Sequence, residues 1–494
     1  MRQTLRRSCG ACARAKSRCD LRKPHCSRCA ARGTACVYAN EPLSSTTPSP
    51  APAPSSSSSA AASPDPRRHR ISGFGSVDPF ETYPHVRLDK EHVQRLIHSC
   101  TSRPCSPPRG AVLHKIAFQY YPLDRSACSN PFLVSWWPLA LGDPVLFHVS
   151  LQTACLDEEF FGRRGFHTSE QLMADSVVLL RRKVQDVALA MQDSTINSVI
   201  TLATIEYGKS NIETAEMHVE GAKRLMDMRG GFQAVMQTSP LTARMVSWVS
   251  MLITGVPQFD TQDDDGNGDG ISPIPEWSAT LSSEHLPTAL SEADVAPETW
   301  NVFARLYGVF RRPHAPPLAP LRLHELTCFV VHRLLSAESP SALSECVRCA
   351  TILYMLILQG PIYYSHAAMQ HRTAARLVAH LPASAASGPL RLWLVAVGLV
   401  AAHGAASPAV YEALREEVRA LGAGSSWAEV AADVKGVLWL ESSAAVAPHA
   451  ERVFESHWDV ALGRRGGQPA ALGPAQIAPF EADSLETSTD LAQR

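Results

Sequence analysis

Six cysteines lie close together near the start of the chain, and their spacing is typical of a metal site. The pattern C-x2-C-x6-C occurs twice in succession, and its members are Cys9, Cys12, Cys19, Cys26, Cys29 and Cys36. A C-x2-C pair on the first turn of a helix directs two thiolates at one metal ion. Zinc in structural sites is held by four ligands in a tetrahedron. The pattern therefore predicts zinc binding.

The number of thiolates indicates how the metal ions are shared. Two separate zinc tetrahedra need eight ligands, and this segment offers six. Two cysteines that each bind both ions would fill all eight positions, and the repeat points to the first cysteine of each unit, Cys9 and Cys26. Forty residues cannot form a sufficient apolar core, so the metal must stabilise the fold. Structural zinc contributes roughly 10–16 kcal/mol in small peptides. Gly33 is a suitable end for the second helix, and Pro24 shapes the loop between the units.

The rest of the chain favours metal ligation over disulfide bonding. The basic N-terminus is not followed by the apolar segment of a secretory signal. The longest apolar run we identify is Leu392 to Ala402, which is shorter than the roughly 18 residues of a membrane span. We interpret it as a buried helix. An intracellular, soluble protein that does not contact membranes is expected, and its thiols would stay reduced.

Charge is distributed unevenly along the chain. Residues 1–40 carry ten Lys or Arg side chains and one acid, a net charge of +9, whereas the remainder carries −10. A basic segment attached to an acidic body indicates a polyanionic partner for that segment.

Residues 9–36 closely resemble the fungal binuclear zinc cluster domain. The resemblance rests on the cysteine spacing, on the basic run between Cys12 and Cys19, and on Pro24 before His25 and Cys26. It implies two zinc ions, double-stranded DNA as the partner and a CGG-like target triplet. It assigns Lys16 to guanine, because Lys can donate to guanine O6 and N7 in the major groove.

Two further basic side chains in that run, Arg14 and Arg18, are expected to contact phosphates, which adds affinity without sequence information. The sequence departs from the family at Ala13 and Ala15, where basic residues are common. Fewer phosphate contacts predict weaker binding and a shallower salt dependence.

Composition divides the chain into four zones. Residues 1–40 form the small metal-organised domain, with two short helices around the cluster. Residues 41–85 are rich in Pro, Ser and Ala, and predict a disordered linker. Residues 86–462 predict a large all-α domain with a mobile polar insertion at about 257–296. Residues 463–494 predict a disordered acidic-hydrophobic tail, a candidate activation segment.

Apolar side chains at helical spacing predict the helices of the large domain. They cover Ser169 to Val187, with a capping box of Thr168 and Gln171; Glu213 to Met228, ended by Gly230 and Gly231; Val410 to Leu421; and a helix capped by Ser426 and Glu429. The linker shows no sustained heptad and many prolines, so a coiled-coil dimer is not predicted there. Monomer and homodimer both remain open.

Residues from about 90 to 460 resemble the fungal-specific transcription factor domain. The resemblance rests on the segments Asp143–His148, Glu216–Gly221 and Met228–Gly231, on Trp393, and on Leu438–Trp439. It implies a helical regulatory domain without catalytic activity, which contacts the transcription machinery or co-regulators and can respond to a small-molecule effector.

Other motifs do not assemble into a site. Gly208-Lys209-Ser210 lacks the first glycine of a phosphate loop, and a calcium-like run from Asp263 has Ile274 where a bidentate Glu is required. Cys346 and Cys349 lie in an apolar helical context and are expected in the core. No catalytic constellation is found, so the protein is not predicted to be an enzyme.

The sequence thus predicts a zinc-dependent, nuclear transcription factor that regulates RNA polymerase II genes in a fungus. The basic residues from Arg2 to Arg18 are expected to direct nuclear import as well. The alternative is a co-regulator or repressor recruited mainly through protein contacts of the helical domain.

Overall fold

The structure is a computed structural model. It describes residues 11–12, 15, 17, 19, 26–34, 36, 83–101, 128–162, 165–278, 290, 295–312, 316–360, 366–403, 408–421, 425–440, 447–465 and 469. The chain divides into two units, residues 1–73 and 74–494, and each is described by itself. The predicted linker 41–85 and the predicted tail 463–494 lie almost entirely outside the described residues. Four residues of the basic run, Ala13, Arg14, Lys16 and Arg18, lie outside them too.

The larger unit is built from helices, which confirms the predicted fold class. The helices of its first part are α3 (Lys90–Thr101), the π-helix η1 (Phe132–Trp136), α5 (Trp137–Leu141), α6 (Pro144–Gly162), α7 (His167–Val184), α8 (Val187–Ala190), α9 (Asp193–Gly208), α10 (Ile212–Met228), α11 (Gly231–Thr238) and α12 (Pro240–Thr254). Those of its second part are α13 (Pro275–Ser278), α14 (Pro297–Phe310), α15 (Pro320–Ser336), α16 (Ala342–Gln359), α17 (Ala367–His380), the 3-10 turn η4 (Leu381–Ala383), α18 (Gly388–Ala402), α19 (Pro408–Leu421), α20 (Trp427–Val437) and α21 (Ala447–Ala461). Within the described residues, β structure is limited to one isolated parallel bridge between Thr261 and Ile271.

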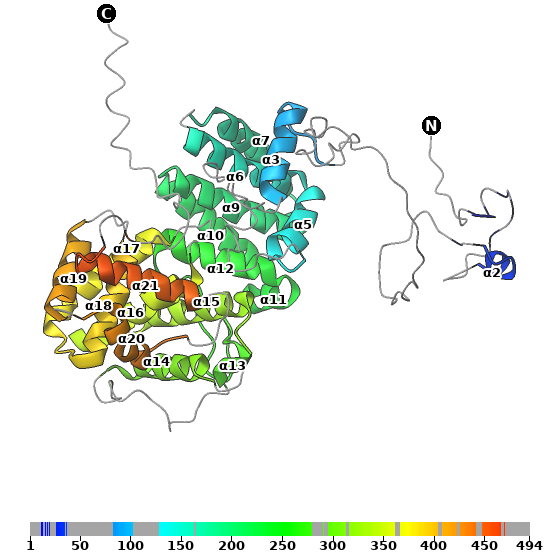
Figure 1. Cartoon of the computed structure of the whole chain (residues 1–494). Helices are drawn as coiled ribbons and strands as arrows, with labels where there is room; N and C mark the ends of the chain where they lie inside the picture. Colours follow the sequence, from blue (N-terminus) through cyan, green and yellow to red (C-terminus); the bar gives the residue numbers. More distant parts are fainter. Residues whose placement is uncertain are drawn as a thin grey trace, which may run out of the picture. The chain divides into compact units, whose positions relative to one another are not determined.

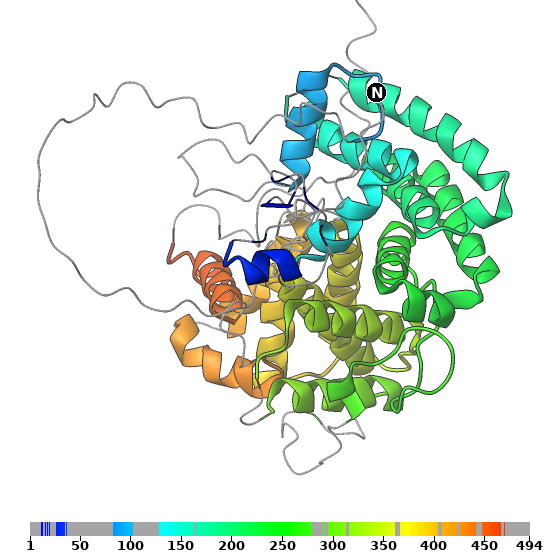
Figure 2. The same ribbon diagram turned by 90° about the vertical axis from the view of Figure 1, so that its right-hand side faces the viewer.

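Two nearly fully buried helices organise the two parts. In the first part α9 packs against α6, α10 and α12; in the second part α16 packs against α15, α17 and α18. Helix α12 also contacts α15, which joins the two parts into one unit. In Figures 1 and 2 the helices of the first part run from blue (α3) to green (α12), and those of the second part from green (α13) to red (α21).

Several predicted helix ends are confirmed. Helix α10 ends at Met228, and Gly230 follows in the left-handed conformation at φ 97°, which glycine adopts without steric cost. Helix α20 begins with the predicted capping box, in which the Glu429 carboxylate accepts the Ser426 N–H at 2.6 Å.

The predicted capping box of Thr168 and Gln171 is wrong. Helix α7 begins earlier, at His167, and Glu159 of α6 accepts the backbone N–H groups of Thr168 at 2.7 Å and Ser169 at 3.2 Å. A carboxylate from another helix therefore caps the N-terminus of α7, where a local side chain was expected to do so.

The apolar run Leu392–Ala402 lies in the buried helix α18, as predicted, but it is not the longest apolar segment. Helix α16 has 18 residues with a mean hydropathy of 1.4, long and apolar enough to cross a membrane, and 89 % of it is buried inside the protein. It serves as a core helix. Its charged pair Glu345 and Arg348 is buried and bonded together at 2.8 Å, so the two charges compensate each other.

The insertion at about 257–296, which the sequence predicts to be mobile, is described at residues 257–278, 290 and 295–296, and its first part makes defined contacts with the core. This loop is fixed to the core by Asp264, whose carboxylate accepts the Trp277 indole N–H at 2.9 Å and the guanidinium groups of Arg333 at 2.6 Å and Arg305 at 3.2 Å. Trp277 is fully buried. Asp263, in the calcium-like run, accepts backbone N–H groups of its own turn.

The end of the helical unit closes the core of its second part. The segment after α20 is extended, and the backbone N–H of Leu440 donates to the Tyr354 hydroxyl at 3.0 Å. The Trp393 indole N–H donates to the Leu438 carbonyl at 3.0 Å. Tyr354 and Trp393 are fully buried, so residues near 440 complete the packing around α16 and α18.

Candidate metal centre and nucleic-acid interface

The first unit holds a compact group of cysteines. Helix α2 (Ser27–Ala31) begins after Cys26, whose thiol accepts the Cys29 N–H at 3.4 Å and caps the helix. Gly33 is left-handed at φ 61°, as expected of a residue that ends this helix. Cys12 lies in a helical turn, in which the Ala15 N–H donates to the Ala11 carbonyl at 3.0 Å. Local geometry therefore places one C-x2-C pair on the first turn of a helix, as the spacing predicts.

Cys26 lies between thiols of both repeat units. Its Sγ is 3.7 Å from the Sγ of Cys12, and its backbone N–H donates to the Sγ of Cys36 at 3.3 Å. The ligand atoms of Cys12, Cys26 and Cys29 all lie within 4.8 Å of one another. These three cysteines and Cys36 are buried.

The crowding of these thiols makes an isolated thiolate unfavourable. The backbone N–H of Cys29 favours the Cys26 thiolate and lowers its pKa, but burial and the thiols of Cys29, Cys12 and Cys36 outweigh it. The net result is a raised pKa for Cys26. Several thiols that disfavour one another's ionisation need a cation to hold them as thiolates.

The group fits zinc. Four sulfurs about 2.3 Å from a central zinc ion lie about 3.8 Å apart along each tetrahedron edge, close to the separation of Cys12 and Cys26. The Sγ of Cys26 also lies within 4.8 Å of the Sγ of Cys29, in its own unit. Contacts with both units are what a thiolate shared by two ions requires.

The other predicted site residues are placed only in part. Cys19 is half-buried and packs against the cluster, whereas Cys9 lies outside the described residues. All three predicted DNA contacts, Arg14, Lys16 and Arg18, lie outside them as well. Arg28 and Arg32, on and just after α2, are exposed. Sequence reasoning did not single out these two, although they belong to the basic segment.

The remaining sequence motifs lie in helical structure. Lys209 caps the C-terminus of α9 with its N–H on the Glu206 and Ile205 carbonyls, which is not the arrangement of a phosphate loop. Cys346 and Cys349 are fully buried in α16, and burial raises the pKa of Cys346 to about 11. These thiols are core residues, as predicted.

Comparison with known families decides what this arrangement is. The model of the "Fungal Zn(2)-Cys(6) binuclear cluster domain" matches residues 7–45, and that of the "Fungal specific transcription factor domain" matches residues 113–253. The chain carries both domains. Domains of the first kind bind two zinc ions, and the crowded cysteines described here fit that role. Neither match is to an enzyme family.

Two curated proteins are similar to the zinc cluster domain. "Transcriptional regulator dmxR14" of Cryptosporiopsis sp. is 68 % identical over 34 residues, and the "Geodin cluster transcription factor" of Aspergillus terreus is 62 % identical over 34 residues. These segments cover 7 % of this chain, and 8 % and 15 % of the two relatives. No solved structure matches the chain.

Proposed function

We propose that this chain is a zinc-dependent, sequence-specific DNA-binding transcription factor that regulates RNA polymerase II genes in a fungal nucleus. The observation that carries the proposal is Cys26, whose sulfur lies 3.7 Å from that of Cys12 in one half and within 4.8 Å of that of Cys29 in the other, in a domain matched by the zinc cluster family. The names of the two relatives also support transcriptional regulation.

In this proposal two zinc ions share six thiolates. Cys9, Cys12, Cys19 and Cys26 hold one ion, and Cys9, Cys26, Cys29 and Cys36 hold the other. Zinc neutralises the thiolates and fixes the two short helices, and it takes no part in redox chemistry. The metal thereby supplies the rigidity that so short a segment lacks.

The rigid segment presents its basic side chains to DNA. Lys16 donates to guanine in a CGG-like triplet, and Arg14 and Arg18 contact phosphates. The exposed Arg28 and Arg32 add positive charge on the second helix. The helical unit is the regulatory part, through which co-regulators or the transcription machinery are contacted.

A binding titration with two probes tests base recognition. The full-length protein is titrated with a duplex containing CGG and with the same duplex carrying a scrambled triplet, at one fixed salt concentration. Lys16→Ala is expected to reduce the preference for CGG by roughly 1–3 kcal/mol. Lys23→Ala, a matched substitution in the same basic segment, is expected to weaken binding to both probes equally. If wild type binds both probes alike, sequence-specific recognition of CGG is wrong.

A second candidate function is a co-regulator recruited mainly by protein contacts. It is favoured by Ala15, which is exposed where related clusters often place a basic residue. The same titration separates the two functions, because a recruited co-regulator would bind neither probe selectively. Its occupancy of promoters would then depend on a partner protein rather than on Lys16.

A further inference from the structure

A groove of about 840 Å³ opens on the first part of the helical unit. Helix α5 forms one wall with Pro138 and Leu139, and the start of α9 forms another with Gln192 and Asp193. The end of α10 and helix α11 complete the lining. A volume of 300–1,000 Å³ is typical of small-molecule sites.

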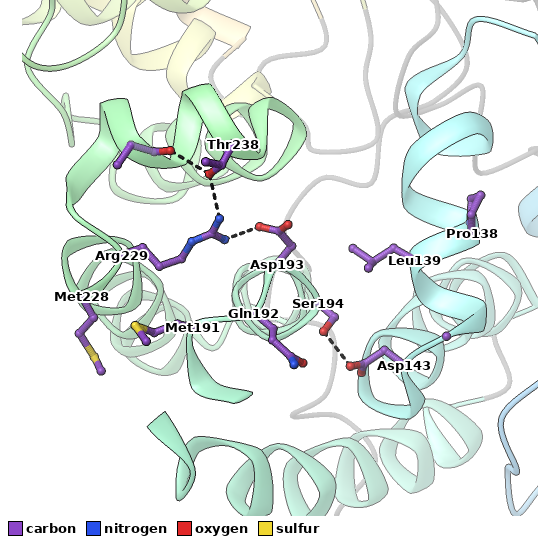
Figure 3. A pocket seen from close by; sticks show the side chains of 12 residues that line it. Pro138, Leu139, Asp143, Met191, Gln192, Asp193, Ser194, Met228, Arg229 and Thr238 are labelled. Atoms are coloured by element: carbon purple, nitrogen blue, oxygen red, sulfur yellow. Dashed lines mark hydrogen bonds and ion pairs between the residues drawn. The ribbon is translucent and has the colours of Figure 1, made fainter. Parts of the chain in front are cut away.

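The charged groups at this groove are already paired. Asp143 accepts Lys183 Nζ in an ion pair and the Ser194 hydroxyl at 2.7 Å. Asp193 is ion-paired with Arg229, as Figure 3 shows. Two carboxylates and two cations cancel, so the groove offers no net charge to a charged ligand.

The hydroxyl groups in the lining are engaged as well. Ser194 also accepts Lys183 Nζ at 2.9 Å, and Thr238 accepts Arg229 Nη2 at 3.0 Å while donating to the Ala234 carbonyl at 2.8 Å. In contrast, the Gln192 side chain is exposed and does not cap α9. Its amide can donate and accept toward an occupant of the groove.

Much of the remaining lining is apolar. Figure 3 shows Met191 and Met228 on one side of Asp193, with Pro138 and Leu139 on the other. Met228 is 52 % exposed, although burying a methionine side chain is favourable. Methionine side chains adapt their shape to a bound partner.

The groove also joins two segments that the sequence analysis singled out. Asp143 begins the segment Asp143–His148, and Met228 and Arg229 begin the segment Met228–Gly231. Both line the groove although they lie far apart in the chain.

We propose that this groove binds a neutral, mainly apolar small molecule with at least one hydrogen-bonding group, which lies against Met191, Met228 and Leu139 and meets the Gln192 amide. The paired charges select against ionised compounds, because an added charge would be desolvated without a partner. This site is independent of the DNA-binding function proposed above.

A matched pair of fluorescent probes tests the proposal on the full chain. N-phenyl-1-naphthylamine is neutral, and 1-anilinonaphthalene-8-sulfonate is the same molecule with a sulfonate. We expect saturable binding of the neutral probe at one site, at least about tenfold tighter than that of the sulfonate, which corresponds to about 1.4 kcal/mol.

The variant Met228→Lys places a charge in the groove and is expected to weaken the neutral probe at least tenfold. Met217→Lys is its control, because Met217 is 62 % exposed on the same helix and does not line the groove; its affinity should match wild type. Hydrogen exchange on wild type should show that the probe protects residues 191–194 and 228–231. Equal effects of the two substitutions, tighter binding of the sulfonate, or protection elsewhere would each overturn the proposal.

Discussion

Acid should unfold the helical unit through three buried histidines. His324, His332 and His366 lie on α15 and just before α17 and are 7 %, 0 % and 1 % exposed. Burial lowers the pKa of each to about 4, with Arg244 contributing to the lowering for His324. In the unfolded chain the same side chains titrate near 6.5.

The direction and size of the effect follow from this difference. Above pH 6.5 both states hold these side chains neutral, so stability is at its plateau. Between pH 6.5 and 4 the unfolded chain binds protons that the folded chain does not, so the free energy of unfolding falls as pH falls. One pKa unit is worth about 1.4 kcal/mol, so each histidine costs up to about 3 kcal/mol at pH 4. Three together cost up to about 9 kcal/mol, which lies within the roughly 5–15 kcal/mol that typically stabilises a folded protein.

Tryptophan fluorescence provides the assay. All nine tryptophans lie between Trp136 and Trp458, so the signal reports on the helical unit and not on the zinc cluster. Urea unfolding at steps from pH 7.5 to 4.0 gives the free energy of unfolding at each pH. Carboxylates with lowered pKa, such as Glu345 at about 2, begin to lose their contribution only near their ordinary pKa of 4.5, so the slope due to histidine is taken between pH 6.5 and 5.

Two variants isolate one histidine. In the described part of the chain, neither ring nitrogen of His366 has a hydrogen-bond partner. His366→Phe should therefore be tolerated at pH 7.5 and should recover about 3 kcal/mol at pH 4. Gln370→Leu, on the next turn of the same buried face, changes a polar group that does not titrate and should leave the slope intact. A wild-type stability that stays flat from pH 6.5 to 4.5, or an unchanged slope in His366→Phe, would refute the reasoning.

Four further substitutions probe other parts of the molecule. Cys26→Ala should lose both zinc ions and Cys29→Ala about one, because Cys26, unlike Cys29, is proposed to serve both metals; equal zinc content in the two variants, by elemental analysis, would contradict the sharing. Asp264→Asn should cost about 3 kcal/mol, because it leaves the buried Arg305 without its charge partner; hydrogen exchange over residues 260–278 should rise, and an unchanged rate would show that the carboxylate does not hold the loop. Gly398→Ala would place a Cβ 2.9 Å from a leucine methyl of α17 and should cost about 1–3 kcal/mol; an unchanged melting temperature would mean that the leucine moves aside.

Features that depend on near neighbours in the sequence could be predicted. The cysteine spacing indicated a shared metal site, and Cys26 lies between the two halves as that sharing requires. The end of α10 at Gly230 and the cap of α20 by Glu429 were predicted for the same reason, because each depends on residues within one turn. The placement of Cys9 and of Lys16 stays a prediction.

Features that depend on distant residues could not be predicted. Glu159 replaces the expected local cap of α7 from the preceding helix. The loop that holds Asp264 has the composition of a mobile insertion, and its ion pairs with Arg305 and Arg333, far along the chain, are not visible in the local sequence. Helix α16 was not identified as an apolar segment, because it contains the charged residues Glu345 and Arg348. These two form an ion pair inside the core.

The hydrogen bonds that Leu438 and Leu440 make with Trp393 and Tyr354 limit how far the chain can be truncated from its C-terminus. A product ending before Leu438 would leave the Tyr354 hydroxyl and the Trp393 indole without the backbone groups they bind, in the interior of the helical unit. A premature stop codon anywhere upstream, even one that spares the whole matched segment 113–253, should thus yield a polypeptide prone to aggregation and degradation. Expression plasmids for the isolated helical unit should extend through α21.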